Sequence, residues 1–408
     1  MSTDNVVRPP FTLAEFLDSW DEESPQRAFS ELARGDLRRR PDDGTEVLAS
    51  RAEIVEFLRH PAVRATDGVH YNMGAQRPLI PLDLDGDRHR FYRRLLDPLF
   101  SPRNVAYLES RIRTRTSALI DEFIEAGEAE LMEALCGPLP SLIFIDLLGL
   151  PLEDLPVFLD FKEAVVRPHG ATLAEQREYM NRAGQVTYDY LVSELARRRA
   201  KPSTDDLIGG FLTTTVDGRT LTDEEIVDIC YLLVIAGIDT VTSSLSCQLA
   251  WLAKHPAERA RIVADESLLG RAVEEIQRFE SPVPLAHRWV AEDITINGRA
   301  FAAGTTVEVL WAAANVDPAN FDDPLTVDFD RPHNNHVGFA AGPHRCLGTN
   351  LARLELRVAL SEFHRRIPDY RIAPGNTVVW INYGVRAALS LPIVFTPDRF
   401  APRNGGSQ

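Results

Sequence analysis

Phe339-Ala-Ala-Gly342-Pro-His-Arg-Cys346-Leu-Gly348 is a glycine-bracketed loop with a single cysteine, and residues 350–366 behind it have the spacing of an amphipathic helix. The positive end of that helix dipole and the free amides at its start favour thiolate over thiol at Cys346. Gly342 and Gly348 allow the backbone to approach the sulfur closely. A single thiolate held in this way suits a soft metal. The loop therefore predicts a metal-ligand cysteine, against the alternative of a buried structural cysteine.

The three other cysteines have no glycine-rich setting, and we interpret them as structural. Cys136, Cys230 and Cys247 are scattered through the chain and form no CxxC pair. This pattern excludes a disulfide framework and argues against a zinc or iron–sulfur site. A cysteine hydrolase is a further alternative. It would need a histidine base with an orienting partner, and the sequence offers no such partner for His344.

A long helix is predicted ahead of this loop. Thr222-Asp-Glu-Glu225 is a capping box, and helical residues continue from it to Lys254, where His255-Pro256 ends them. About thirty residues at 1.5 Å each make a rod of roughly 45 Å. Residues 231–238 are apolar on every side, so the rod must run through the protein interior.

Asp239 and Thr240 interrupt the most apolar part of that rod. A buried carboxylate is costly, and Gly237 costs about 1 kcal/mol relative to alanine in a helix interior. The hydroxyl of Thr240 can bond the carbonyl four residues back. Stability alone does not explain such a polar notch, so it predicts a functional site.

The rest of the chain is mainly helical with smaller β-rich parts, and we expect one domain over residues 1–408. The helix-rich parts are about 50–282 and 350–366, and the β-rich parts are about 30–60, 285–311 and 376–396. Asn297-Gly298 has the composition of a type I′ hairpin turn. Strands are also expected near 378–381 and 389–395. Residues 71–86 lack a clean period, which predicts a long irregular loop, and such loops are usually functional.

Composition excludes several classes of protein. The 408 residues carry 44 Lys and Arg against 60 Asp and Glu, a formal charge of −16, which argues against nucleic acid as the main partner. The apolar runs are shorter than the ~20 residues of a membrane span. The first ten residues have neither a basic nor an apolar leader segment, so we expect a cytoplasmic protein.

The cysteine loop resembles the FxxGxxxCxG haem-binding loop of the cytochrome P-450 family of haem-thiolate monooxygenases, soluble bacterial type. Glu275-Ile-Gln-Arg278 resembles the ExxR motif, Ala236-Gly-Ile-Asp-Thr240 the oxygen-activation motif, and His89 with Arg93 the haem-contacting helix. The resemblance covers roughly residues 11–396, with Ala340 where the family usually has glycine. A methyl group should alter the loop little. The resemblance implies a triangular helical prism with haem between the long central helix and the Cys-ligand loop.

The resemblance also implies roles for individual residues. Cys346 would bind the iron of heme b (thiolate-ligated iron protoporphyrin IX), and Thr240 and Asp239 would be catalytic, delivering protons. Glu275, Arg278 and Arg331 would form a buried structural ion network. Four further cofactor-binding residues would hold the haem propionates: His89, Arg93, Arg288 and His344. The other expected cofactor contacts are Phe339, Gly348 and Ala236. An apolar substrate pocket would be lined by Tyr71, Met73, Leu79, Ile80, Leu233, Val283, Leu285 and Val385. His70, Arg77 or His169 could anchor a polar end of the substrate.

The implied reaction is hydroxylation of an unactivated C–H bond in a small hydrophobic molecule: a terpenoid, steroid-like or aromatic compound. The reaction uses O2 and electrons from a ferredoxin and its NAD(P)H-dependent reductase. Basic residues near the ligand loop predict a docking patch for an acidic ferredoxin: Arg90, Arg94, Arg345, Arg353 and Arg357. The alternatives are a peroxide-driven peroxygenase, which the Asp239-Thr240 pair argues against, and a non-catalytic haem- or ligand-binding protein.

Overall fold

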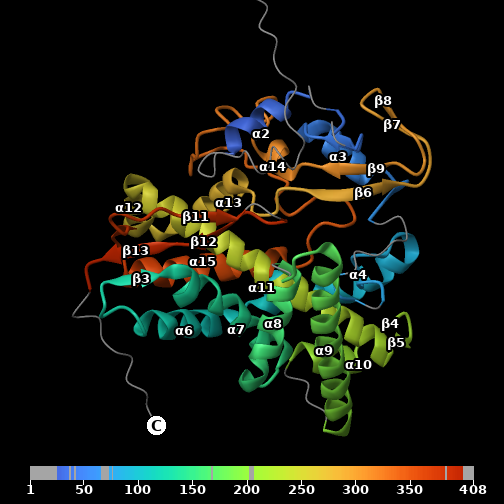
Figure 1. Ribbon diagram of the computed structural model, residues 1–408, viewed down its shortest axis with the longest axis horizontal. Helices are drawn as coiled ribbons and strands as arrows, with labels where there is room; N and C mark the ends of the chain where they lie inside the picture. The colour runs from blue at the N-terminus through green and yellow to red at the C-terminus, as the bar shows by residue number, and fades with distance from the viewer. Residues whose placement is uncertain are drawn as a thin grey trace, which may run out of the picture.

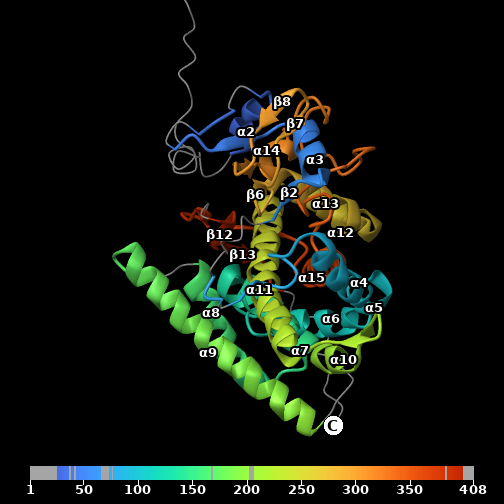
Figure 2. The same cartoon turned by 90° about the vertical axis from the view of Figure 1, so that its right-hand side faces the viewer.

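The computed structural model describes residues 25–35, 38–40, 43–65, 73–75, 77–166, 169–201, 206–381 and 384–397. Its centre is α11 (Asp223–Lys254), a continuous helix of 32 residues. Figure 2 shows α11 running from the strand-rich part of the molecule through the helical part, with α9 (Leu173–Ala200) oblique to it. The predicted capping box forms, because the side chains of Thr222 and Glu225 each accept a hydrogen bond from the other's backbone amide.

Helices surround α11 and make the larger part of the molecule (Figure 1). Those packed against it include α7, α8, α9, α13 and α15. The helices of this part are α4 (Gly86–Leu99), α5 (Pro102–Val105), α6 (Leu108–Asp121), α7 (Pro138–Leu148), α8 (Leu155–Val166), α10 (Leu207–Thr213), α12 (Pro256–Ala264), α13 (Leu269–Glu280) and α15 (Thr349–Arg366), with short turns of other helix types at Met132–Cys136, Leu152–Asp154 and Glu266–Leu268.

A four-stranded sheet stands at the other end of the molecule, beside three short helices (Figure 1). Its order is β1 (Glu46–Leu48), β9 (Thr306–Val309), β6 (Ala286–Val290) and β2 (Val63–Arg64), with β1 and β9 parallel and the other pairs antiparallel. The helices are α2 (Gln26–Leu32), α3 (Arg51–Arg59) and α14 (Trp311–Asn315). Residues 43–60, expected to be β-rich, thus hold one three-residue strand and α3.

The remaining strands form small sheets. β7 (Ile294–Ile296) pairs with β8 (Arg299–Phe301) through Asn297 and Gly298, and both turn residues have positive φ (47° and 78°), which confirms the predicted type I′ turn. β10 (Tyr370–Ile372), β13 (Pro392–Phe395) and β3 (Glu128–Glu130) form a three-stranded sheet, β11 (Val379–Ile381) pairs with β12 (Ala387–Ser390), and β4 (Thr215–Val216) with β5 (Arg219–Thr220). The single strand expected over 389–395 is wrong, because Leu391 separates β12 and β13 into different sheets.

α11 is apolar and long enough to cross a membrane by length and composition, but 61% of its most apolar 18-residue window is buried inside the protein. Burial of this kind is typical of the core helix of a globular fold. Its side chains join a large hydrophobic cluster with α6, α7, α8, α13 and α15. The rod therefore runs through the interior, as its sequence predicts.

Candidate functional site

The cysteine loop is fixed by close backbone contacts. Gly342 has φ of 72°, and a Cβ at this position would collide with the carbonyl oxygen of Leu58, so only glycine fits. The amide of Cys346 donates to the carbonyl oxygen of Phe339 at 2.9 Å. The hydroxyl of Thr349 donates to the carbonyl oxygen of Cys346 at 2.7 Å. These contacts place the thiol directly before α15.

The expectation that alanine at position 340 is harmless to the loop is wrong. Its φ is 58°, in the left-handed region, which an L-residue other than glycine, asparagine or aspartate rarely adopts. The expectation considered only the volume of the added methyl group. The backbone angle adds conformational strain, so alanine here destabilises the loop relative to glycine.

Cys346 is the one exposed cysteine among the described residues, whereas Cys136, Cys230 and Cys247 are buried. The exposed surface of Cys346 lines a cavity. Burial raises the pKa of the thiol, although the Gly348 amide, Thr349 and two arginines act in the opposite direction. The predicted thiolate preference is therefore wrong for the protein alone, because the helix start does not outweigh desolvation. A coordinating metal would deprotonate the thiol outright.

The cavity has a volume of about 320 Å³ and lies between α11 and the cysteine loop. α11 lines it with one stripe of residues at helical spacing: Leu232, Leu233, Ala236, Gly237, Thr240, Val241 and Ser244. The stripe explains why Ala236 is exposed although it lies in the middle of a helix whose central part is otherwise buried or half-buried. Thr240 therefore faces the same space as Cys346.

Asp239 does not line this cavity. Its side chain is half-buried and makes a polar interaction, so the costly unpaired carboxylate that the sequence suggested does not occur. The stripe continues from Thr240 to Val241, so Asp239, which lies 100° from Thr240 on the opposite side, falls outside it.

A group of nitrogen-bearing side chains lies at the wall of the cavity. The rings of His89 and His344 are tilted by 34° to each other with centroids 4.1 Å apart, and Arg93 lines the same wall. Burial, together with the charges of His344 and Arg93, lowers the pKa of His89 to about 4. Asp85 accepts a hydrogen bond from Nε2 of His344 at 3.0 Å. Nitrogen donors gathered beside a thiol fit a metal cofactor that carries carboxylates, and thus fit haem.

Arg288 does not line the cavity. Its guanidinium donates to the carbonyl oxygen of His287 at 2.7 Å and lies 5.9 Å from the centroid of the Trp311 ring, which does line it. Phe339, Gly348 and Ala236, the other expected cofactor contacts, all line the cavity.

The expected substrate pocket is brought together only in part. Leu233 and Val283 line the cavity, whereas Met73, Leu79, Ile80, Leu285 and Val385 do not. Leu79 and Ile80 are buried in the main hydrophobic core, and Leu285 packs against the small core beside α2 and α14. His70 and Tyr71 lie outside the described residues. The loop residues were misplaced because the loop at 71–86 has no hydrophobic period, and without one the sequence does not indicate the direction of each side chain.

Several lining residues were missed by the sequence reasoning. α7 contributes Pro140, Ile143, Phe144 and Leu147, and its nearly uniform apolarity, with no polar face, was the available signal. The loop before α4 contributes Pro81 and Leu82. Glu355 of α15 and Gln277 of α13 also line the cavity, and each is buried with one side-chain oxygen that has no hydrogen-bond partner. No periodic signal marks these two.

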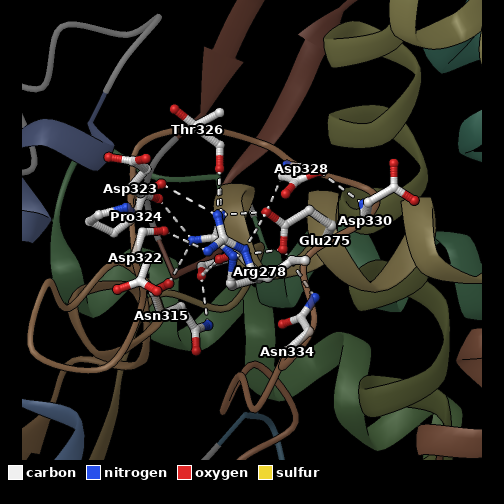
Figure 3. Close-up of polar contacts among 12 residues, drawn as sticks. Glu275, Arg278, Asn315, Asp322, Asp323, Pro324, Thr326, Asp328, Asp330 and Asn334 are labelled. Atoms are coloured by element: carbon white, nitrogen blue, oxygen red, sulfur yellow. Dashed lines mark hydrogen bonds and ion pairs between the residues drawn. The ribbon is translucent and has the colours of Figure 1, made fainter.

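Glu275 and Arg278 of α13 are the centre of a buried ion network (Figure 3). Arg278 donates to both carboxylate oxygens of Glu275 at 2.7 and 2.8 Å and to the carbonyl oxygens of Asn315, Pro324 and Thr326. Arg331 adds a bond to Glu275 at 3.0 Å. The structure thus brings the three predicted members together, away from solvent.

The predicted docking arginines are mostly paired within the chain. Arg353 binds Glu274, and His336 with Arg353 lowers the pKa of that carboxyl to about 2 although burial acts in the opposite direction. Arg357 binds Glu109, Arg90 binds Asp87 and Arg94 binds Asp217. Among the described residues, exposed Arg345 makes no ion pair. Their positive charges are thus largely neutralised locally.

Comparison with known proteins gives consistent matches. The family model for Cytochrome P450 matches residues 156–366. Steroid C26-monooxygenase of Mycobacterium tuberculosis (strain CDC 1551 / Oshkosh) is 30% identical over 88% of this chain and 97% of its own length. Cytochrome P450 monooxygenase PikC of Streptomyces venezuelae is 33% identical over 85% of this chain and 81% of its own. The crystal structure of CYP109E1 from Bacillus megaterium in complex with testosterone has a TM-score of 0.82 at 28% identity, covering 91% of this chain and 99% of that one.

Proposed function

The chain belongs to the cytochrome P450 family, and from that premise we propose that it hydroxylates an unactivated C–H bond of a small hydrophobic molecule with O2 and externally supplied electrons. One observation carries the proposal. Cys346, Thr240 and the donors His89, Arg93 and His344 line one cavity, although they come from three separate parts of the chain.

Heme b fits this donor set. Cys346 would hold its iron, and His89, Arg93 and His344 would hold its propionate carboxylates, because charge-assisted hydrogen bonds suit a buried carboxylate. When bound, the haem supplies the redox chemistry with O2.

The chain's own residues would supply orientation and protons. Thr240 lines the cavity with its hydroxyl at 2.7 Å from the carbonyl oxygen of Ala236, where the hydroxyl oxygen can still accept a hydrogen bond from water. Asp239, on the adjoining face of α11, would receive protons from outside the cavity and pass them toward Thr240.

The substrate class follows from the lining. The polar lining consists of the residues assigned above together with a few others, among them Ser244, Gln277 and Glu355. The rest of the wall is mainly apolar and includes Phe144, Leu147, Leu233 and Val283. Such walls favour a terpenoid, steroid-like or aromatic substrate. The steroid named for the M. tuberculosis relative and the testosterone bound to CYP109E1 are compatible with this class.

The decisive experiment is the spectrum of the reduced carbon monoxide complex. The native protein should show the strongly red-shifted Soret band of a thiolate ligand, and Cys346→Ser should lose it. Cys136→Ser, in the buried core, is the matched control and should retain it. Native protein without the band contradicts haem-thiolate function. A spin-state screen of hydrophobic compounds then narrows the substrate.

Electrons would come from a separate ferredoxin and an NAD(P)H-dependent reductase. Arg345 is the sharpest point at which to test docking, because reversing Arg353 would also break its bond to Glu274. Arg345→Glu should slow reduction by an acidic ferredoxin and weaken its salt dependence. Reduction that is unchanged at every salt concentration argues against a basic docking patch at this position.

A further inference from the structure

The carboxylate of Glu274 on α13 holds two side chains from the region of the cysteine loop. Nε of Arg353 on α15 donates to one of its oxygens at 2.6 Å, and Nη2 of the same guanidinium donates to the other. Nε2 of His336, in the loop before α15, donates to the carboxylate at 3.2 Å. One acidic residue thus joins α13, α15 and the chain segment that leads to Cys346.

The hydrogen bonds of His336 determine where its ring proton lies. The backbone amide of Gly338 donates to Nδ1 at 3.1 Å, so Nδ1 carries no proton. The proton therefore lies on Nε2, the nitrogen that faces Glu274. The side chain of His336 is only 2% exposed. Because both ring nitrogens are engaged, Glu274 and Gly338 together fix the orientation of this ring.

Arg353 and His336 both lie beside the ring of Phe339. The guanidinium carbon of Arg353 is 4.8 Å from the ring centroid, a cation–π distance, and the centroid of the His336 ring is 5.8 Å away. Phe339 lines the cavity, and its carbonyl oxygen accepts the amide hydrogen of Cys346 at 2.9 Å. Glu274 is therefore connected, through two side chains and one ring, to the backbone of the cysteine.

The charge of Glu274 suits it to hold this cluster. Burial raises the pKa of its carboxyl, but His336 and Arg353 outweigh that effect and lower the pKa to about 2. Its side chain is 27% exposed and that of Arg353 is 34% exposed. An ion pair with this much exposure contributes little stability. The arrangement is better explained by the position that it imposes on Phe339.

We propose that Glu274 is a positioning residue that fixes Phe339 and the backbone of Cys346 through Arg353 and His336, and thereby sets the redox potential of the cofactor iron. Hydrogen bonding and packing around a ligating sulfur are among the means by which a protein sets the potential of haem. The inference rests on the proposed function only in taking haem as the group that Cys346 binds.

The first test measures the midpoint potential of the holoenzyme by dithionite titration without ferredoxin, so that docking plays no part. Glu274→Gln should shift the reduction equilibrium about tenfold toward the ferrous form, which is 59 mV for one electron. The reason is that Arg353 then keeps its positive charge without the carboxylate, and this favours the added electron.

Glu109→Gln is the matched control for charge. It removes the carboxylate that binds Arg357, one turn further along α15, and neither Glu109 nor Arg357 lines the cavity. The control should leave the potential unchanged. A shift equal to that of Glu274→Gln would contradict a specific role for Glu274.

Arg353→Lys separates positioning from charge. Lysine keeps the positive charge but lacks the planar fork that binds both oxygens of Glu274 and lies beside Phe339. The potential should rise in this variant too, because water that reaches the loosened sulfur stabilises the more negative ferrous state. The double variant Glu274→Gln with Arg353→Lys should loosen the loop no more than either single variant, since the two residues act as one unit.

Amide hydrogen exchange over residues 338–346 measures the loosening itself and does not depend on haem. Exchange should become about tenfold faster in both Glu274→Gln and Arg353→Lys, because the amides of Gly338 and Cys346 lose firmly held acceptors. Glu109→Gln should exchange at the native rate.

Two outcomes overturn the proposal. One is unchanged exchange over residues 338–346 in both variants, and the other is a potential that shifts in Glu274→Gln but not in Arg353→Lys, an effect of charge alone. Either result leaves the proposed function standing if the native protein shows the reduced carbon monoxide band. Absence of that band removes the proposed function and the effect on potential together, while the exchange measurement still decides whether Glu274 holds the loop.

Discussion

The hydroxyl of Thr240 donates a hydrogen bond to the carbonyl oxygen of Ala236, 2.7 Å away, on the stripe of α11 that lines the cavity. In this geometry its hydrogen is engaged by the helix and its lone pairs face the cavity. Thr240 is therefore positioned first as an acceptor for water. It can donate to a bound molecule only by leaving the bond to Ala236.

Replacing Thr240 with alanine should uncouple electron use from product. NADH consumption should continue while the product formed per NADH falls about a hundredfold, at the lower end of the usual general acid–base contribution. The ratio of product to NADH, with peroxide quantified alongside, checks this. Thr242→Ala is the matched control, because Thr242 makes the same bond to Ile238 at 2.9 Å but is buried and does not line the cavity. Unchanged coupling in Thr240→Ala would remove the assigned role.

Ala340→Gly should stabilise the protein. The φ of 58° strains alanine but not glycine, and relief of that strain should raise the free energy of unfolding by about 1 kcal/mol. Urea unfolding followed by circular dichroism measures the change. Ala341→Gly is the control: this neighbour does not have a positive φ, so the same substitution there should destabilise. If Ala340→Gly lowers the free energy of unfolding, the positive φ of Ala340 does not destabilise the loop and the prediction is wrong.

Glu355→Gln should stabilise the protein at pH 8 and have little effect near pH 4. Burial raises the pKa of Glu355 to about 8 in the folded protein, against an ordinary 4.5. Between these values the unfolded chain binds fewer protons than the folded one, so the native protein loses stability as pH rises through this window. Glutamine removes that loss, which is on the order of 4 kcal/mol at pH 8. Urea unfolding of both proteins at several pH values measures it, and a pH-independent difference would contradict the assignment.

Glu275→Gln should destabilise the protein severely. The substitution leaves the charge of Arg278 buried without its carboxylate, and breaking one partner of such a pair typically costs about 3–5 kcal/mol. Arg90→Ala breaks only an exposed pair with Asp87 and should change stability by less than about 1 kcal/mol. Comparable unfolding midpoints for the two variants would mean that the network contributes little.

The sequence was sufficient where short-range interactions dominate. The capping box at Thr222 and the Asn297-Gly298 turn form as expected, because each depends on a few neighbouring residues. The mainly helical class follows from local periodicity, and the pairing of Glu275 with Arg278 follows from their spacing of three residues on one helix. The strand expected over 389–395 failed because both of its halves are strand-like and only their different partners separate them.

The features of the site also separate into those set by neighbouring residues and those set by distant parts of the chain. The sequence by itself determined that Cys346 lies in a glycine-bracketed loop before a helix and that Thr240 interrupts an apolar rod, because loop and helix are each continuous in the chain. Only the tertiary structure decided that the Cys346 thiol is desolvated, that Leu79 and Ile80 point into the core, and that Arg353 is held by Glu274. Desolvation, side-chain direction in an aperiodic loop and ion pairing all depend on atoms from distant parts of the chain, which are adjacent only after folding.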